Sequence, residues 1–167
     1  MQRQPTLLSS CARAATAAEA RYRISTTKFS PREYRVIGLD ERSARLVRDI
    51  AENRWGGGHF LVFETALPDD ALLRHASGGT ALLSEELAGA DAVVMVATAE
   101  GSAEAASIIG DAAAARGIMS AGLVLQGNGT GDARSDAVVS ALRPNAMVLV
   151  VLQEADDLAE VLSALRV

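Results

Sequence analysis

The amino-acid sequence predicts an α/β domain built on a doubly wound, mostly parallel sheet with helices on both faces. From Tyr34 onward, segments with a strand pattern alternate with segments with a helical pattern, as in parallel sheets with crossover helices. Residues 90–98 are almost continuously apolar, which is typical of a central strand buried on both faces. With 167 residues, of which 49% are hydrophobic, the chain is long enough for one well-buried core. We therefore expect a flexible basic N-terminal arm over residues 1–33 and a single α/β domain over residues 34–167.

The first predicted strand covers residues 34–39, and Asp40 is a favourable N-cap for a helix that runs through Asn53. Apolar side chains recur along this helix at helical spacing, and three glycines at 56–58 end it. The second predicted strand follows at once, over residues 59–64.

The middle of the chain is ambiguous. Residues 69–75 fit either a short helix or a poor edge strand. Gly78 and Gly79 interrupt the pattern, and Thr80 begins a predicted helix through Ala88, with glutamates in favourable early positions. The apolar run at 90–98 then gives a strand that we expect in the interior of the sheet.

The C-terminal part continues the alternation and ends on an amphipathic helix. Its predicted elements are a helix at 102–116 ended by Gly117, a strand at 118–125, a glycine-rich loop at 127–131, a helix at 132–142 closed by Pro144 and Asn145, a buried strand at 146–152 and a helix at 154–165. A Rossmann-like sheet is the simplest arrangement of these elements.

The charge is unevenly distributed along the chain. Residues 1–35 hold seven Lys or Arg and two acidic residues, whereas residues 36–167 hold nine basic and nineteen acidic residues. An acidic body argues against nucleic-acid binding, because phosphate neutralisation needs clustered Lys and Arg. The basic arm fits a solubilising tail, with contact to an acidic partner or a membrane surface as the alternative.

The single cysteine, Cys11, cannot form an internal disulfide or a cysteine-rich zinc site, so we expect a reducing, cytoplasmic location. The Arg-rich first thirty residues also have the composition of an organellar transit peptide, and this alternative stays open. No apolar run approaches the ~20 residues of a transmembrane helix.

Few side chains have a pattern that indicates catalysis. His59 and His75 have no metal-ligand spacing with other ligand residues, so we interpret them as a strand-entry and an edge residue. The adjacent pairs Glu85–Glu86 and Asp156–Asp157 are interpreted as solvated helix faces. Trp55 is expected to pack under a helix end, with an exposed anchor for a partner as the alternative. No Gly-x-Ser-x-Gly nucleophile elbow is present.

Four segments from Tyr34 to the C-terminus resemble the nucleotide-binding half of the tubulin/FtsZ family, in order and spacing. They are Tyr-Arg-Val-Ile-Gly at 34–38, Glu-Glu-Leu-Ala-Gly-Ala-Asp-Ala-Val-Val-Met-Val-Ala-Thr-Ala-Glu-Gly at 85–101, Gly-Asp-Ala-Ala-Ala-Ala-Arg-Gly-Ile-Met-Ser-Ala-Gly-Leu-Val-Leu at 110–125, and residues 135–149 with Ala-Leu-Arg-Pro-Asn-Ala-Met-Val-Leu. The resemblance implies the topology of that family's GTPase domain. It also implies that residues 100–106 occupy the place of the family's phosphate loop.

The chain departs from the family at the positions that would hold phosphate. The first turn reads Gly38-Leu39-Asp40-Glu41, which places two carboxylates where phosphate oxygens would approach. The family's Gly-Gly-Gly-Thr-Gly-[Ser/Thr]-Gly loop is replaced by Glu100-Gly101-Ser102-Ala-Glu, which adds negative charge near a helix N-terminus. The family's later segment with catalytic acids is not found. Binding of GTP or GDP is therefore disfavoured, and we expect no cofactor.

These observations lead to two hypotheses. The first is a catalytically inactive tubulin/FtsZ-like domain that serves as a protein-interaction, assembly or regulatory subunit, with a protein partner or a homo-oligomer. The alternative is a Rossmann-like module that binds a nucleotide or another small ligand at the carboxyl ends of its strands. The candidate binding residues for such a ligand are Gly38, Glu100, Gly101, Ser102, Gly127, Asn128 and Gly129.

Overall fold

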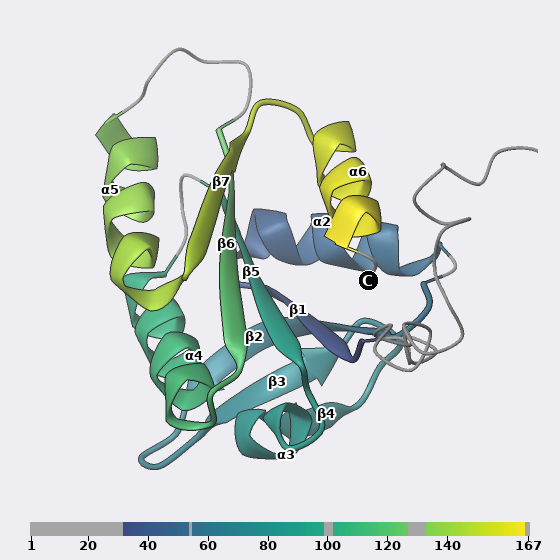
Figure 1. Ribbon diagram of the computed structural model, residues 1–167, viewed down its shortest axis with the longest axis vertical. Coiled ribbons are helices and arrows are strands. Elements are labelled where there is room, and N and C mark those ends of the chain that lie inside the picture. The colour runs from purple at the N-terminus through teal and green to yellow at the C-terminus, as the bar shows by residue number, and fades with distance from the viewer. Residues whose placement is uncertain (1–31, 54, 99–101, 127–132, 166–167) are drawn as a thin grey trace, which may run out of the picture. The chain divides into compact units, whose positions relative to one another are not determined.

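The computed structural model describes residues 32–53, 55–98, 102–126 and 133–165 (Figure 1). A seven-stranded sheet in the order β4-β3-β2-β1-β5-β6-β7 forms the centre of this part of the chain. The strands are β1 (Tyr34–Gly38), β2 (Gly58–Ala66), β3 (Ala71–His75), β4 (Thr80–Leu82), β5 (Ala92–Thr98), β6 (Met119–Leu125) and β7 (Val148–Leu152). The helices are α2 (Glu41–Ala51), α3 (Leu83–Leu87), α4 (Ala103–Ala115), α5 (Ala133–Leu142) and α6 (Asp156–Leu165), with a 3-10 turn η2 (Arg143–Asn145). The predicted α/β, mostly parallel architecture is confirmed.

Five strands of the sheet are parallel, and β1 lies between β2 and β5. Gly38, the last residue of β1, is level with Val62 of β2 and Val96 of β5. The chain leaves β1 toward β2 and later returns to the other side of β1 with β5, so the strand order reverses there. In doubly wound sheets ligands bind at the carboxyl ends of the strands, next to this reversal.

The segment after β2 differs from the prediction. Residues 71–75, which the sequence left ambiguous, form strand β3 antiparallel to β2, and the predicted helix from Thr80 is wrong at its start. Residues 80–82 instead form the edge strand β4, and α3 covers only Leu83–Leu87. Pairing with β3 outweighs the local helical pattern, since tertiary contacts commonly override propensity in short segments.

Two apolar layers enclose the sheet. On one face α3, α4 and α5 pack over side chains of β1, β3 and β5, including Ile37, Leu73 and Met95. On the other face α2 and α6 pack over side chains that include Val36 and Val94. All seven residues of β5 are buried, which confirms the predicted interior strand.

The last strand is not the buried strand that the sequence predicts. β7 lies at the sheet edge, and of its five residues only Leu152 is fully buried. Its apolar run is as continuous as that of an interior strand, so sequence alone did not separate the two.

The N-terminal arm at 1–33 falls almost entirely outside the described residues, which begin just before β1. Within the described part of the chain, no helix is both long enough and apolar enough to span a membrane.

Candidate functional site

Helix α2 packs closely against the carboxyl end of β1. A Cβ atom added to Gly38 would lie 2.9 Å from the backbone nitrogen of Ala44 and 3.0 Å from its Cα. Both atoms belong to the helix backbone, so a side chain at position 38 would require α2 itself to shift. Gly38 therefore allows the close helix–strand packing that the last glycine of a dinucleotide-binding turn allows.

Asp40 follows two residues later and caps α2. Its carboxylate accepts a hydrogen bond of 2.8 Å from the amide of Ser43, and the Ser43 hydroxyl accepts one of 3.0 Å from the amide of Asp40. This reciprocal capping box confirms the predicted N-cap.

The same carboxylate also binds the end of β5. It accepts hydrogen bonds from the Thr98 amide at 2.7 Å and from the Thr98 hydroxyl at 2.9 Å. The Leu39 amide donates to the carbonyl of Val96 at 2.9 Å, so the turn after β1 is held against β5 by backbone as well. Asp40 thus joins the two strands at the reversal of strand order.

This arrangement places an internal anion where a bound phosphate would be expected. A helix N-terminus offers unpaired amides and a positive dipole end, and phosphates bind there in doubly wound folds. In this chain the Asp40 carboxylate accepts hydrogen bonds from the Ser43 amide at that helix end and from the Thr98 amide at the end of β5. A phosphate at the same place would have to displace a covalently attached carboxylate.

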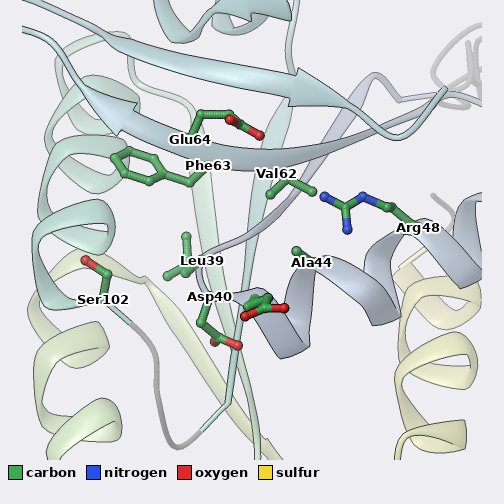
Figure 2. Close-up of a pocket in the computed structure, with 9 residues that line it drawn as sticks. Leu39, Asp40, Ala44, Arg48, Val62, Phe63, Glu64 and Ser102 are labelled. Carbon is green, nitrogen blue, oxygen red and sulfur yellow. The ribbon is translucent and has the colours of Figure 1, made fainter. Parts of the chain in front are cut away.

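A cleft of about 450 Å³ opens beside this turn (Figure 2). The turn after β1, α2, β2 and the N-cap of α4 contribute its walls, and Ser102 is the one predicted binding residue in the described part of the chain that lines it. The lining residues are Leu39, Asp40, Glu41, Ala44, Arg48, Val62, Phe63, Glu64 and Ser102.

The cleft carries more negative than positive charge. Glu41 pairs with Arg45 on the exposed face of α2, and Glu64 forms two hydrogen bonds with Arg74, at 2.6 and 3.0 Å. The hydrogen bond from Arg74 is the main reason that the pKa of Glu64 lies below its ordinary value. Arg48 contributes the cationic side chain of the lining, and the described residues provide it with no ion pair or hydrogen bond. Any occupant would therefore meet acids on two walls.

The structure brings only part of the predicted site together. Gly38 and Ser102 lie at neighbouring strand and helix ends, and Ser102 caps α4 by accepting from the Ala105 amide at 3.2 Å. The other candidates, Glu100, Gly101, Gly127, Asn128 and Gly129, lie outside the described residues. Leu39, Val62 and Phe63 also line the cleft. Sequence reasoning missed them, because apolar residues of strands and of the turns beside them show no pattern that tells a cleft from the core.

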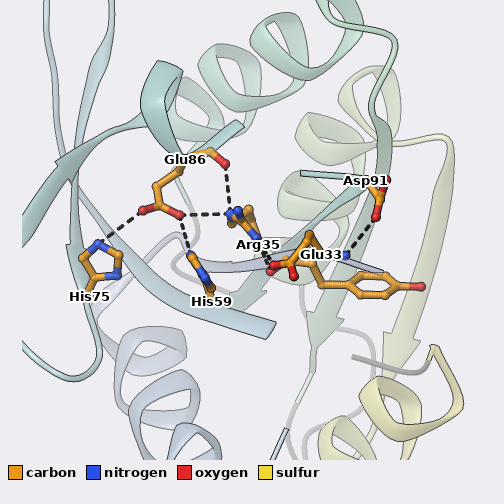
Figure 3. Close-up of polar contacts among 7 residues, drawn as sticks. Glu33, Arg35, His59, His75, Glu86 and Asp91 are labelled. Carbon is orange, nitrogen blue, oxygen red and sulfur yellow. Dashed lines mark hydrogen bonds and ion pairs between the residues drawn. The ribbon is translucent and has the colours of Figure 1, made fainter. Parts of the chain in front are cut away.

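A second polar cluster lies at the opposite, amino ends of β1 and β2 (Figure 3). The Glu86 carboxylate contacts the Arg35 Nε at 3.0 Å, the His59 Nδ1 at 2.9 Å and the His75 Nε2 at 3.3 Å. Arg35 is a buried residue, and its Nε also donates to the Glu86 carbonyl at 2.9 Å. The interpretation of Glu86 as part of a solvated helix face is therefore wrong, because α3 turns this carboxylate toward a buried arginine.

The interpretation of Trp55 as a residue that packs under a helix end is confirmed. Trp55 packs under the end of α2, where its indole nitrogen donates to the Ile50 carbonyl at 2.8 Å and its ring lies 5.5 Å from that of Phe60. Among the residues that the structure describes, no group of three or more His, Cys, Asp or Glu side chains is arranged to hold a metal ion.

Comparison with known proteins adds no family assignment. No protein-family model matches the chain, and no curated protein matches it.

Proposed function

We propose that this chain is a non-catalytic α/β domain, related in design to the tubulin/FtsZ nucleotide-binding half, that acts by binding protein rather than by hydrolysing a nucleotide. The position of the Asp40 carboxylate carries the proposal. It accepts hydrogen bonds from the backbone amides of Ser43 and Thr98. In a phosphate-binding turn, backbone amides at this place would donate hydrogen bonds to the phosphate.

The surrounding charges support the same conclusion. A triphosphate at the reversal of strand order would approach Asp40, Glu41 and Glu64 together. Like charges close to one another raise the free energy of the bound state. Arg45 and Arg74 compensate Glu41 and Glu64 in part, whereas the Asp40 carboxylate accepts its hydrogen bonds from Ser43 and Thr98 rather than from a cation.

The direct test is a titration of the full chain with fluorescent GTP and GDP, with and without magnesium, followed by competition with unlabelled nucleotide. We expect no competable binding at millimolar nucleotide. The Asp40→Asn variant removes the internal anion, and Glu41→Gln removes a neighbouring charge that takes no part in the cap. Competable binding by the unaltered chain would refute the proposal.

A second experiment tests whether self-assembly of the chain is independent of nucleotide. Sedimentation velocity of the full chain, with and without GTP and magnesium, should give the same distribution of species. An assembly that forms only with GTP would identify a nucleotide switch and contradict the proposal.

The cleft favours a second candidate function, the binding of a small ligand other than a nucleotide. Its volume of about 450 Å³ lies within the range of small-molecule sites. The apolar Leu39, Val62 and Phe63 and the acidic lining fit a small amine with an apolar part. A panel of amines, each matched with a carboxylate of similar shape, should raise the melting temperature only for amines. No shift across the panel would reject this candidate.

A further inference from the structure

The outer edge of β7 is unpaired within the described part of the chain. β7 pairs in parallel with β6 alone, and the Leu152 carbonyl accepts from the Gln126 amide at 2.9 Å. In a parallel pair, a residue directs both backbone groups to one neighbour and the next residue directs both away. Leu152 and Val150 therefore face β6. Leu149 and Val151 present their N–H and C=O groups at the outer edge.

The side chains of this edge are apolar. Val148 is 52% exposed and Val151 is 40% exposed, and β7 contains no charged residue and no proline. Natural sheets usually protect an edge strand with lysine, proline, a bulge or a very short strand. The opposite edge follows this rule, because β4 has only three residues, whereas β7 has none of the protective residues.

Helices lie on both faces of β7 without closing its edge. Figure 1 shows α5 on one side of β7 and α6 on the other. Leu149 packs with the layer of α4 and α5, and Val150 with the layer of α2 and α6. Because helices already cover both faces, an occupant of this edge has to be another β-strand, which supplies backbone partners.

We propose that the occupant is β7 of a second copy of this chain, paired antiparallel about a twofold axis at Val150. The proposal rests on the proposed function and names the protein that such a domain binds. Only residues with outward backbone groups form hydrogen-bonded antiparallel pairs. Leu149 of each copy therefore pairs with Val151 of the other, which gives four hydrogen bonds with full overlap of the two strands.

In this register each exposed apolar side chain of β7 lies opposite an apolar side chain of the second copy. Directly opposite residues of an antiparallel pair lie on the same face of the sheet. Exposed Val151 lies opposite half-buried Leu149 of the second copy, and exposed Val148 lies opposite buried Leu152. Each exposed valine thus receives an apolar neighbour, as a self-complementary twofold interface requires.

The charges beyond the strand favour the antiparallel direction. Arg143 precedes β7 and is exposed, whereas Glu154 and Asp156 follow it and are exposed. An antiparallel pair brings the basic end of each strand toward the acidic end of the other. A parallel pair would place the acidic ends side by side, which costs free energy.

The first experiment measures self-association of the full chain by sedimentation equilibrium, over roughly a hundredfold range of concentration. We expect a concentration-dependent dimer. Val151→Lys places a charge opposite Leu149 and should give a monomer with unchanged circular dichroism. Leu67→Lys is the matched control, since Leu67 is 39% exposed but lies between β2 and β3, and this variant should still dimerise. Val148→Lys repeats the test if Val151→Lys does not fold.

The second experiment tests the register by disulfide formation in a Cys11→Ser background. Val150→Cys places two thiols on the axis, where a non-hydrogen-bonded pair has Cα atoms about 4.5 Å apart, within disulfide range. It should form a covalent dimer under mild oxidation. In Val148→Cys the two thiols are offset by four residues, about 13 Å along the strands, so this variant should not cross-link.

Two results would overturn the proposal. If the full chain stays monomeric throughout the concentration range, β7 does not pair with a second copy, and its partner has to be sought in residues 1–31 or in another protein. A dimer that survives both lysine substitutions at β7 uses another surface. Neither result concerns nucleotide binding, so failure of this inference and failure of the proposed function are separate outcomes.

Discussion

The Asp40 carboxylate and Thr98, 58 residues apart in the sequence, are joined by two hydrogen bonds at the reversal of strand order. One is to the Thr98 amide, which ends a fully buried strand, and the other is to its hydroxyl. A helix cap that also binds the neighbouring strand couples local and long-range structure in one side chain. The residue that disfavours phosphate is therefore also a stabilising residue of the fold.

Replacement of Asp40 by alanine should lower the free energy of unfolding by about 2–4 kcal/mol. The loss of an N-cap costs about 1 kcal/mol, and the loss of the two hydrogen bonds to the Thr98 amide and hydroxyl adds about 1–3 kcal/mol. Urea unfolding followed by circular dichroism measures this change. The control is Glu41→Gln, which alters only an exposed ion pair and should cost less than about 0.5 kcal/mol. Equal effects of the two substitutions would contradict the role assigned to Asp40.

Replacement of Gly38 by alanine should destabilise the domain by about 1–3 kcal/mol, as overpacking of a well-packed site does. The added Cβ would meet the backbone of Ala44 at 2.9 Å, so α2 must move away from β1. Gly56→Ala is the matched control, since a Cβ there has no neighbour within 4 Å. Chemical denaturation of both variants gives the comparison, and a neutral Gly38→Ala would show that α2 moves at little cost.

The Asp40 turn was predictable because its parts are local. Gly38, the N-cap at Asp40 and the apolar spacing of α2 lie within one short segment, and the run at 92–98 is buried on both faces. The sequence-based predictions failed where contacts between residues far apart in the sequence determine the structure. β4 forms because it pairs with β3. The Glu86 side chain turns inward because it contacts Arg35, which lies 51 residues earlier in the chain. Which of two adjacent glutamates faces a buried arginine cannot be read from the helix alone. The edge position of β7 likewise depends on the order of strands in the sheet.

Acid should destabilise the domain through Asp70. Burial is the largest influence on this carboxyl and raises its pKa, but the hydrogen bonds from the Ser84 hydroxyl and from the Ala71 and Ser84 amides together lower it. A carboxyl with a lowered pKa in the folded state stabilises fully above its ordinary pKa of about 3.9, and that contribution is lost as pH falls through the folded value. Glu64, whose pKa is lowered chiefly by Arg74, acts in the same direction.

The test is urea unfolding of the unaltered chain and of Asp70→Asn at a series of pH values. The variant should be less stable at pH 7 and should lose less stability than the unaltered chain between about pH 5 and pH 2. If both proteins lose stability in parallel over this range, Asp70 does not contribute to the acid sensitivity.

Replacement of Glu86 by alanine should be the most damaging single change at the amino ends of the strands. It leaves the Arg35 guanidinium, whose side chain is 6% exposed, with the half-exposed Glu33 at 3.4 Å as its remaining carboxylate partner, and removes the acceptor that His59 and His75 share. Removal of one member of a buried ion pair costs about 3–5 kcal/mol, and Glu33 offsets only a part of this cost because it is partly exposed to solvent.

Urea unfolding of Glu86→Ala measures this cost, and two further variants show its cause. Glu85→Gln changes the adjacent, exposed glutamate, keeps an acceptor for the Leu82 amide and should be nearly neutral. The double variant Arg35→Met with Glu86→Leu removes both charges and should recover a large part of the stability lost in Glu86→Ala, since apolar replacement of a whole buried pair is often neutral. A double variant less stable than Glu86→Ala would show that the packing of Arg35, rather than its charge, holds α3 to the sheet.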